Sequence, residues 1–178
     1  APQAGDKLRI QVGPGFRYQI GIDDARPGDF EVVSSGVTVL VDPDSAEHID
    51  GITLDFRDGP EGGVVIDNPN EPPPVHQLAV SDLKAMMDAG SPYRLLDVRT
   101  DEERATASIA GAIKLEPSAI ADLSNLEEGT PIVLHCHHGG RSQQAAEQLR
   151  ARGFSNVHNL VGGIDAWSLE IDPTVPRY

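Results

Sequence analysis

The sequence predicts an α/β domain with a central, mostly parallel sheet flanked by helices, preceded by a small β-rich domain. Two observations lead to this fold class. Short strand-like runs separated by Gly, Pro and Asp fill the first 70 residues, whereas apolar strands alternate with helical segments after residue 75. Between the two stretches stand the successive prolines Pro72, Pro73 and Pro74, which favour a stiff, extended connection. We therefore expect domains at residues 1–72 and 75–178.

β-branched or alternating runs predict six strands in the first domain. We expect these strands at residues 7–12, 16–22, 31–33, 37–42, 52–56 and 63–66. Ser35 and Gly36 stand between two of the runs and are typical of a hairpin turn. One short helix is expected at residues 43–49.

The second domain alternates helices and strands. Ser81 can cap a helix that runs to Gly90, and acidic residues at 101–103 suit the N-terminus of a second helix. Further helices are expected at 117–126, 142–152 and 164–169, and strands at 93–98, 131–134 and 156–160. The run at 131–134 is continuously apolar, as in a strand that is buried on both faces of a parallel sheet.

Composition excludes several classes of protein. The formal charge of −14 argues against nucleic acids and anionic membranes as partners, and no apolar run approaches the roughly 18 residues that span a bilayer. The first 74 residues contribute −9 of this charge. A single cysteine forms neither an internal disulfide nor a thiolate cluster, and it favours a reducing, cytoplasmic location. The chain begins at Ala1 without a signal peptide, which is typical of a processed chain or a fragment.

One loop, at residues 135–142, combines a thiol with groups that can activate it. It reads His-Cys-His-His-Gly-Gly-Arg-Ser and lies between an expected buried strand and a helix, where ligands bind in open α/β sheets. Gly139 and Gly140 let successive N–H groups point into one concavity, and the following helix adds positive partial charge. Arg141 adds a permanent positive charge. All three effects would stabilise a thiolate, so we expect a lowered pKa and a nucleophilic thiol at Cys136.

The same loop has features of a phosphatase or arsenate reductase loop, of a metal site and of a structural cysteine. The loop also resembles that of Cys-dependent phosphatases and arsenate reductases, but these place five residues between Cys and Arg, and only four separate Cys136 from Arg141. The adjacent side chains at 135–138 cannot all converge on one tetrahedral ion, so we expect no metal and no cofactor. A lone cysteine can also be a small buried hydrophobic residue. We expect His137 and His138 to line the site entrance or to face solvent.

Four motifs in the second half resemble those of rhodanese-type sulfurtransferases. They occur in the family's order and spacing, from about residue 76 to about residue 169. The motifs are the loop at 136–142, Leu95-Leu96-Asp97-Val98-Arg99 with Glu103, Ile109-Ala110-Gly111-Ala112, and the segment from Asn159 to Trp167. One departure is Ser108, where the family often has histidine.

The resemblance implies a sulfurtransferase. Cys136 would take a sulfane sulfur from thiosulfate or a protein persulfide, and a thiol acceptor, such as a glutaredoxin or thioredoxin-like protein, would remove it in a ping-pong reaction. Arg141 would hold the loop and favour anionic donors, and Asp97 would either pair with a basic group near the loop or serve as a helix cap or surface ion pair. The remaining loop residues, which would bind the persulfide, are His137, His138, Gly139, Gly140 and Ser142. The alternative is a non-enzymatic partner-binding or sulfur-relay module with a vestigial loop.

The first domain resembles the A-type iron–sulfur carriers of the HesB/IscA kind over residues 8–70. The motifs that carry this resemblance are Phe16-Arg17-Tyr18, Ile22-Asp23-Asp24, Gly36-Val37, Val41-Asp42-Pro43, Ile49-Asp50-Gly51 and Asn68-Pro69-Asn70. The three cysteines of that family are missing, so cluster binding is not implied. We expect a degenerate module for docking, dimerisation or substrate presentation, or an inert spacer. The oligomeric state is left open.

Overall fold

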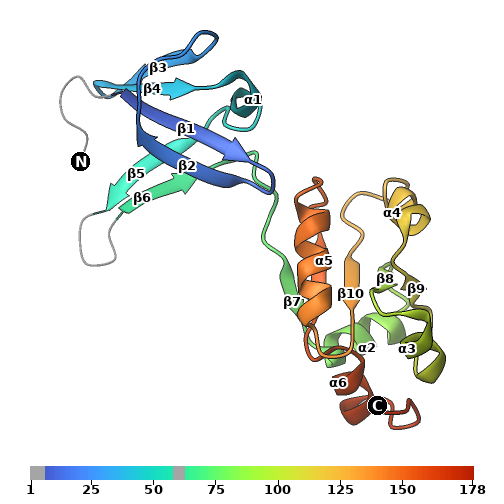
Figure 1. The fold of residues 1–178 in the computed structure, drawn as a ribbon. Coiled ribbons are helices and arrows are strands. Elements are labelled where there is room, and N and C mark those ends of the chain that lie inside the picture. Colours follow the sequence, from blue (N-terminus) through green and yellow to red (C-terminus); the bar gives the residue numbers. More distant parts are fainter. Residues whose placement is uncertain (1–6, 58–62) are drawn as a thin grey trace. The chain divides into compact units, whose positions relative to one another are not determined.

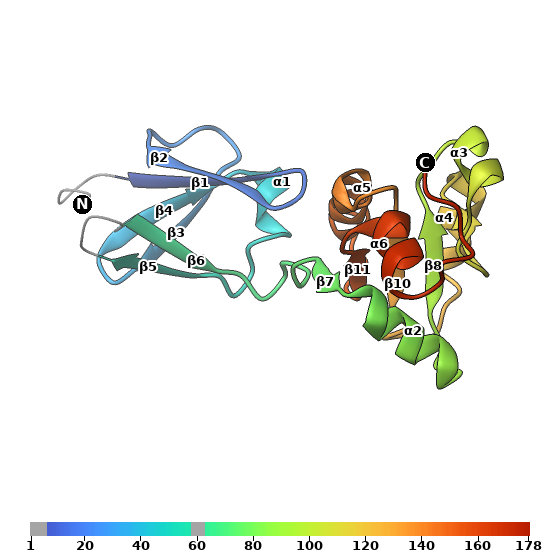
Figure 2. The ribbon, with the colours of Figure 1, turned by 90° about the horizontal axis from the view of Figure 1, so that it is seen from below.

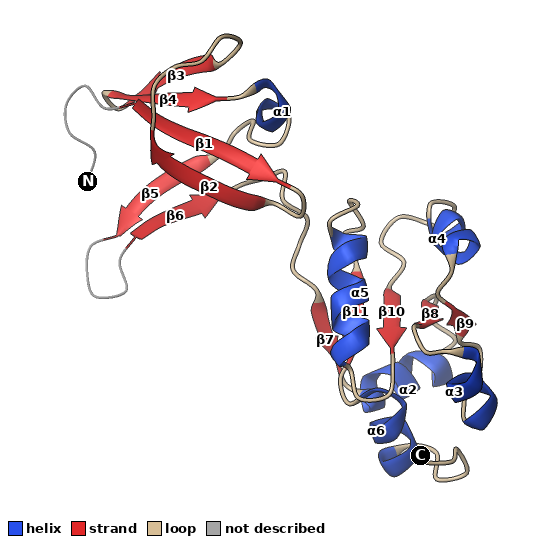
Figure 3. Cartoon of the chain, in the orientation of Figure 1, coloured by secondary structure: helices blue, strands red, loops and turns tan. Residues whose placement is uncertain are grey.

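The computed structural model describes residues 7–57 and 63–178, and the chain divides into two compact units, Ala1–Pro72 and Pro73–Tyr178. The two units differ in their secondary structure. In the described part of the first unit, the regular secondary structure is strands apart from one short helix, whereas the second unit mixes helices with strands (Figure 3).

The first unit contains a four-stranded sheet, a two-stranded sheet and one short helix. Its strands are β1 (Lys7–Gly13), β2 (Arg17–Ile22), β3 (Phe30–Ser34), β4 (Val37–Val41), β5 (Thr53–Arg57) and β6 (Gly63–Asp67), and its helix is α1 (Pro43–Ala46). The larger sheet has the order β2–β1–β4–β3, and β5 pairs with β6. Each predicted strand is present, with its ends within one residue of the expected bounds.

The turn between β3 and β4 forms where the sequence predicts it. Ser35 and Gly36 both have positive φ angles, 49° and 81°, and the two strands pair antiparallel on either side of them. Two positive φ angles in a two-residue turn match the right-handed twist of the strands. The helix α1 ends at Ala46, three residues earlier than expected.

The second unit is an α/β domain (Figure 1). Its sheet has five parallel strands in the order β7–β11–β10–β8–β9. This confirms the predicted fold class. The strands are β7 (His76–Leu78), β8 (Arg94–Asp97), β9 (Ile113–Lys114), β10 (Ile132–His135) and β11 (Val157–Leu160). The helices are α2 (Val80–Asp88), α3 (Asp101–Thr106), α4 (Pro117–Leu123), α5 (Gly140–Arg150) and α6 (Gly163–Glu170).

Two apolar clusters sandwich this sheet. On one face, α4 and α5 pack through side chains such as Leu123 and Leu149 against Leu134 of β10. On the other face, α2 and α6 pack through side chains such as Leu83 and Trp167 (Figure 2). Successive residues of β10 therefore point into different clusters, and all four are buried. This double burial explains why the strand is apolar throughout.

Two short strands and one helix cap differ from the predictions. The strands β7 and β9 span only three and two residues, too few to show a periodic pattern. The helix α2 begins at Val80 after Ala79, so Ser81 lies inside its first turn and is not the N-cap residue. Within the described residues, no helix combines the length and apolar character that crossing a membrane requires.

Candidate active site

Cys136 lies directly after the carboxyl end of β10, in the turn that leads into α5. The neighbours β11 and β8 flank β10, so the turn lies at the centre of the parallel sheet. The cysteine is only 2% exposed. The backbone N–H of Gly139 donates a hydrogen bond to Cys136 Sγ at 3.1 Å, and Ser142 Oγ lies 3.4 Å from the same sulfur.

The surroundings of Cys136 act on its pKa in opposite directions. Burial by itself raises the pKa of a thiol. Against this, the Ser142 hydroxyl and the backbone N–H groups of Ser142, Gly139 and His138 stabilise the ionised sulfur, and the net pKa of Cys136 lies below its ordinary value. Gly139, the N-cap residue of α5, makes this possible because its φ of 98° is a left-handed conformation that favours glycine.

Arg141 forms a bidentate ion pair with the carboxylate of Glu103. Its two terminal nitrogens lie 2.8 and 2.6 Å from the carboxylate oxygens. The hydrogen bonds from Arg141 lower the pKa of Glu103 to about 2, so the carboxylate is ionised at neutral pH. The sequence predicts that Arg141 adds a permanent positive charge that stabilises the thiolate. The structure corrects this, because Glu103 offsets much of that charge and the main donors to the sulfur are backbone N–H groups and a hydroxyl.

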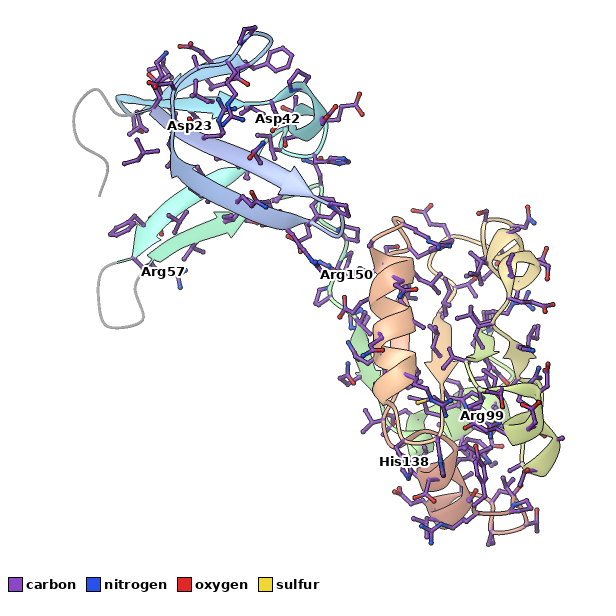
Figure 4. All side chains as sticks on the ribbon, viewed as in Figure 1. Asp23, Asp42, Arg57, Arg99, His138 and Arg150 are labelled. Carbon is purple, nitrogen blue, oxygen red and sulfur yellow. The ribbon has the colours of Figure 1, made fainter. Side chains whose placement is uncertain are left out.

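Asp97 is a fully buried member of an ion pair with Arg99. The nitrogens Nη2 and Nε of Arg99 lie 2.6 and 2.9 Å from the two carboxylate oxygens, and both side chains have no exposed surface. Burial opposes ionisation of Asp97, but the hydrogen bonds from Arg99 hold its pKa below the usual range. The alternative of a helix cap or a surface ion pair is therefore wrong, and the basic partner of Asp97 is Arg99, which follows β8 (Figure 4).

His135 ends β10 and is also fully buried. Burial lowers its pKa to about 4, which keeps the imidazole neutral at neutral pH although Asp97 lies 3.6 Å away. A neutral ring adds no positive charge next to the thiol.

Comparison with known proteins places this domain in a family. The sequence profile of the rhodanese-like domain matches residues 79–170. The chain belongs to the rhodanese family. This match confirms the resemblance predicted for the second half of the chain, whereas the resemblance of residues 8–70 to iron–sulfur carriers stays a prediction.

Individual relatives of the rhodanese-like domain carry sulfurtransferase names. The chain is 36% identical over 74 residues to Thiosulfate sulfurtransferase GlpE of Pseudomonas entomophila, covering 41% of this chain and 68% of that protein. It is 30% identical over 131 residues to Adenylyltransferase and sulfurtransferase MOCS3-2 of Zea mays, covering 69% of this chain. It spans only 27% of the length of that maize protein. A solved rhodanese-like domain protein from Staphylococcus aureus is 28% identical, with a TM-score of 0.47, covering 58% of this chain and 99% of that one.

The first turn of helix α6 forms backbone hydrogen bonds with the cysteine loop of the rhodanese-like domain. The backbone N–H groups of Ile164 and Asp165 donate to the carbonyl oxygens of Cys136 and His137, at 2.9 and 3.1 Å. Gly163 lies so close to these carbonyl groups that a side chain does not fit. Sequence reasoning assigned this glycine to a family signature but did not predict its contact with the loop, because the two segments are far apart in the chain.

The segment after α6 also reaches the loop. The ring of Tyr178 stacks on His137 with centroids 4.3 Å apart, and its hydroxyl accepts a hydrogen bond from Arg99 at 2.9 Å. His138 stacks on the other histidine at 3.9 Å and is exposed (Figure 4). No sequence motif pointed to Tyr178, so this contact is a finding of the tertiary structure.

Three side chains near the loop could offer ligand atoms to a metal. The donor atoms of His137, His138 and Asp165 lie within 4.8 Å of one another. However, Arg177 forms an ion pair with Asp165 at 2.7 Å, and this cation competes with a metal for the carboxylate. We assign no metal to this group.

The thiol of Cys136 is expected to ionise below pH 8.5, the value of an unperturbed cysteine. The donors in the loop stabilise the charged sulfur more than burial penalises it. Because the chain has a single cysteine, the pH dependence of alkylation by iodoacetamide reports this group alone. A midpoint at or above that of a free cysteine peptide would remove the electrostatic case for the loop.

Proposed function

We propose that the chain is a sulfurtransferase that moves a sulfane sulfur from thiosulfate or a persulfide donor to a thiol acceptor through a persulfide on Cys136. The observation that carries this proposal is the cluster of donors around Cys136 Sγ at the end of the central strand. The sulfurtransferase names of relatives such as Thiosulfate sulfurtransferase GlpE support the same class of reaction. Cys136 and Arg141 are the residues to which we assign catalysis.

The proposed reaction has two displacement steps. In the first, the Cys136 thiolate attacks the outer sulfur of thiosulfate, a new S–S bond forms to Sγ, and the S–S bond of thiosulfate breaks with release of sulfite. In the second, an acceptor thiolate or cyanide attacks the terminal sulfur of the persulfide and Sγ leaves as a thiolate. The N–H groups of the loop stabilise the anionic sulfur at both stages, and no external oxidant or reductant is required.

The other loop residues would bind the donor and the persulfide. Ser142 and Gly139 supply donors to the sulfur, while His137, His138 and Gly140 shape the loop around it. We expect a protein with a reactive thiol, such as a glutaredoxin or thioredoxin-like protein, to be the acceptor. Reduced thiols persist in a reducing compartment, which is where we propose that the protein acts.

Mass spectrometry after thiosulfate treatment tests the proposal. The intact protein is expected to gain the mass of one sulfur atom, and cyanide is expected to remove that mass while thiocyanate appears. The Cys136→Ser variant is the matched control, since it loses the nucleophile with little change in volume. A protein that binds partners through a vestigial loop would gain no sulfur, and equal thiocyanate formation by both proteins would also contradict the proposal.

Arg141 is expected to select for anionic donors. Arg141→Ala should raise the KM for thiosulfate about tenfold or more, because a charge-assisted hydrogen bond to the donor is lost. Glu103→Gln should act in the opposite direction and lower the KM about two- to fivefold, since an exposed ion pair that competes for the guanidinium is removed. Glutamine can still serve in the capping box that Glu103 forms with Thr100. Steady-state rates with thiosulfate and cyanide distinguish these outcomes, and a shift of both variants in one direction would refute the assignment.

A further inference from the structure

A line of side-chain hydrogen bonds runs from the surface of α5 to the buried thiol. Gln143 Nε2 donates to Glu147 at 2.9 Å, and Gln77 Nε2 donates to Gln143 Oε1 at 2.8 Å. Asn159 Nδ2 then donates to Gln77 Oε1 at 3.1 Å. Finally, Ser142 Oγ lies 2.7 Å from Asn159 Oδ1. Strand β7, strand β11 and helix α5 each contribute to this line, so it exists only in the folded domain.

Glu147, at the outer end of the line, determines which atom of each amide donates and which accepts. A carboxylate only accepts hydrogen bonds, so Glu147 requires the amide nitrogen of Gln143 to face it. The carbonyl oxygen of Gln143 then faces Gln77, and the same reasoning turns the oxygen of Gln77 toward Asn159. The amide oxygen of Asn159 is consequently the atom that faces Ser142.

The Ser142 hydroxyl has one proton and three acceptors within reach. These are Asn159 Oδ1 at 2.7 Å, the carbonyl oxygen of Gly139 at 3.1 Å and Cys136 Sγ at 3.4 Å. Ser142 is fully buried and Asn159 is 5% exposed, so water does not readily substitute for these partners. The carbonyl of Gly139 already accepts from the N–H of Gln143. Asn159 Oδ1 therefore offers the shortest contact for this proton and is the main alternative to the sulfur.

We propose that Asn159 is a positioning residue that draws the Ser142 hydroxyl proton away from Cys136, so that the sulfur gains this donor only when it is charged. A thiolate attracts the proton more strongly than a neutral amide does, and the hydroxyl turns toward it on ionisation. The inference rests on Cys136 as the nucleophile of the proposed function. As a consequence, a smaller fraction of Cys136 is ionised in the resting protein than the donors of the loop would produce without Asn159. Because the thiolate is the form that oxidises, the resting thiol is less susceptible to oxidation.

Charged and titratable groups around the thiol act in addition to this hydroxyl. The loop carries His137 and His138, and β10 contributes the neutral His135. Helix α5 contributes Arg141, α3 contributes Glu103, and α6 contributes Asp165. The buried pair of Asp97 and Arg99 belongs to β8 and the residues after it. The substitutions below leave all of these groups in place.

A double-mutant cycle on the alkylation midpoint tests the proposal. Asn159→Leu is expected to lower the Cys136 midpoint by about half a pH unit to one unit, because Ser142 loses its competing acceptor. Ser142→Ala is expected to raise the midpoint by a similar amount. In the Ser142→Ala background, Asn159→Leu should have no further effect, since no hydroxyl remains to be redirected. An unchanged or raised midpoint in Asn159→Leu, or a decrease that persists without Ser142, would overturn the proposal.

A surface variant covers the case in which Asn159→Leu does not fold. Gln77→Ala removes the acceptor that orients Asn159, so the amide can turn its nitrogen toward Ser142 and release the hydroxyl to the sulfur. The midpoint should again decrease, while the exposed Gln148→Ala on α5 should leave it unchanged. Equal midpoints in these two variants would contradict the proposal. Alkylation requires no sulfur transfer, so this result stands apart from the mass-spectrometric test of the proposed function.

Discussion

Replacement of Arg99 by methionine is expected to lower the free energy of unfolding of the rhodanese-like domain by about 3–5 kcal/mol. The substitution leaves the carboxylate of Asp97 buried without its charged partner. It also removes hydrogen bonds to the carbonyl oxygen of Ala107 and to the Tyr178 hydroxyl. Arg104 Nε lies 3.4 Å from the same carboxylate and compensates in part, which favours the lower end of the range.

Urea unfolding followed by Trp167 fluorescence measures this effect. The chain has a single tryptophan, and it is buried in the core of the rhodanese-like domain, so its signal reports that domain. Arg152→Met is the matched control, because this arginine is exposed and its replacement should change stability by no more than about 0.5 kcal/mol. Similar losses in the two variants would contradict a structural role for the buried pair.

The loss of unfolding free energy caused by Arg99→Met is expected to depend on pH. In the wild type, the pKa of Asp97 lies below its ordinary value, so the pair stabilises the fold above that range and is lost only in acid. Without Arg99, burial raises the pKa of Asp97 and the variant takes up a proton on folding. Its stability then decreases as pH rises, and the deficit should grow from about pH 5 to about pH 8.

Replacement of Gly163 by alanine is expected to destabilise the domain by about 3 kcal/mol and to slow alkylation of Cys136 at a fixed pH. A Cβ atom at this position would lie 2.4 Å from the carbonyl oxygen of Cys136 and 2.5 Å from that of His137. Gly163 also has a φ of +57°, which strains any other residue. Backbone atoms must move to relieve the clash, and these atoms belong to the loop that holds the thiol.

Gly90→Ala separates the clash from the backbone strain. Gly90 has a similar φ of +63°, but a Cβ atom there would meet no other atom within 4 Å. We expect this control to lose only about 1–2 kcal/mol and to keep the alkylation rate of the wild type. If both variants lose equal stability and react alike, the contact of α6 with the cysteine loop does not position the thiol.

Most of the secondary structure could be predicted from local patterns. The strands of the first unit and the buried strand β10 carry β-branched or apolar runs that Gly, Pro and Asp delimit. The strands β7 and β9 could not be found in this way, because they are short and are held by pairing with β11 and β8. Likewise, Ser81 has the chemistry of a helix cap, but the N-cap residue of α2 is Ala79, two residues earlier.

The sequence predicted the cysteine loop of the candidate site, but not how its side chains pair or that Tyr178 contacts it. The sequence places Cys136 between a buried strand and a glycine-rich turn, which is enough to predict a reactive thiol. It does not show that Glu103 engages Arg141, because 38 residues separate the two side chains. It also left open whether Asp97 pairs with a basic group near the loop or serves as a helix cap or surface ion pair, whereas the fold buries this carboxylate against Arg99.

The amino-acid sequence by itself determined the α/β class of the second domain, the family resemblance and the identity of the one thiol. These properties depend on local periodicity, on motif spacing and on composition, all of which can be read along the chain. Only the tertiary structure decided which groups act on that thiol. The Ser142 hydroxyl, the amide of Asn159 and the backbone of α6 reach the loop from separate elements. Their contacts depend on packing across the sheet, since hydrogen bonds and close approaches are set by distances in space rather than by separation in sequence.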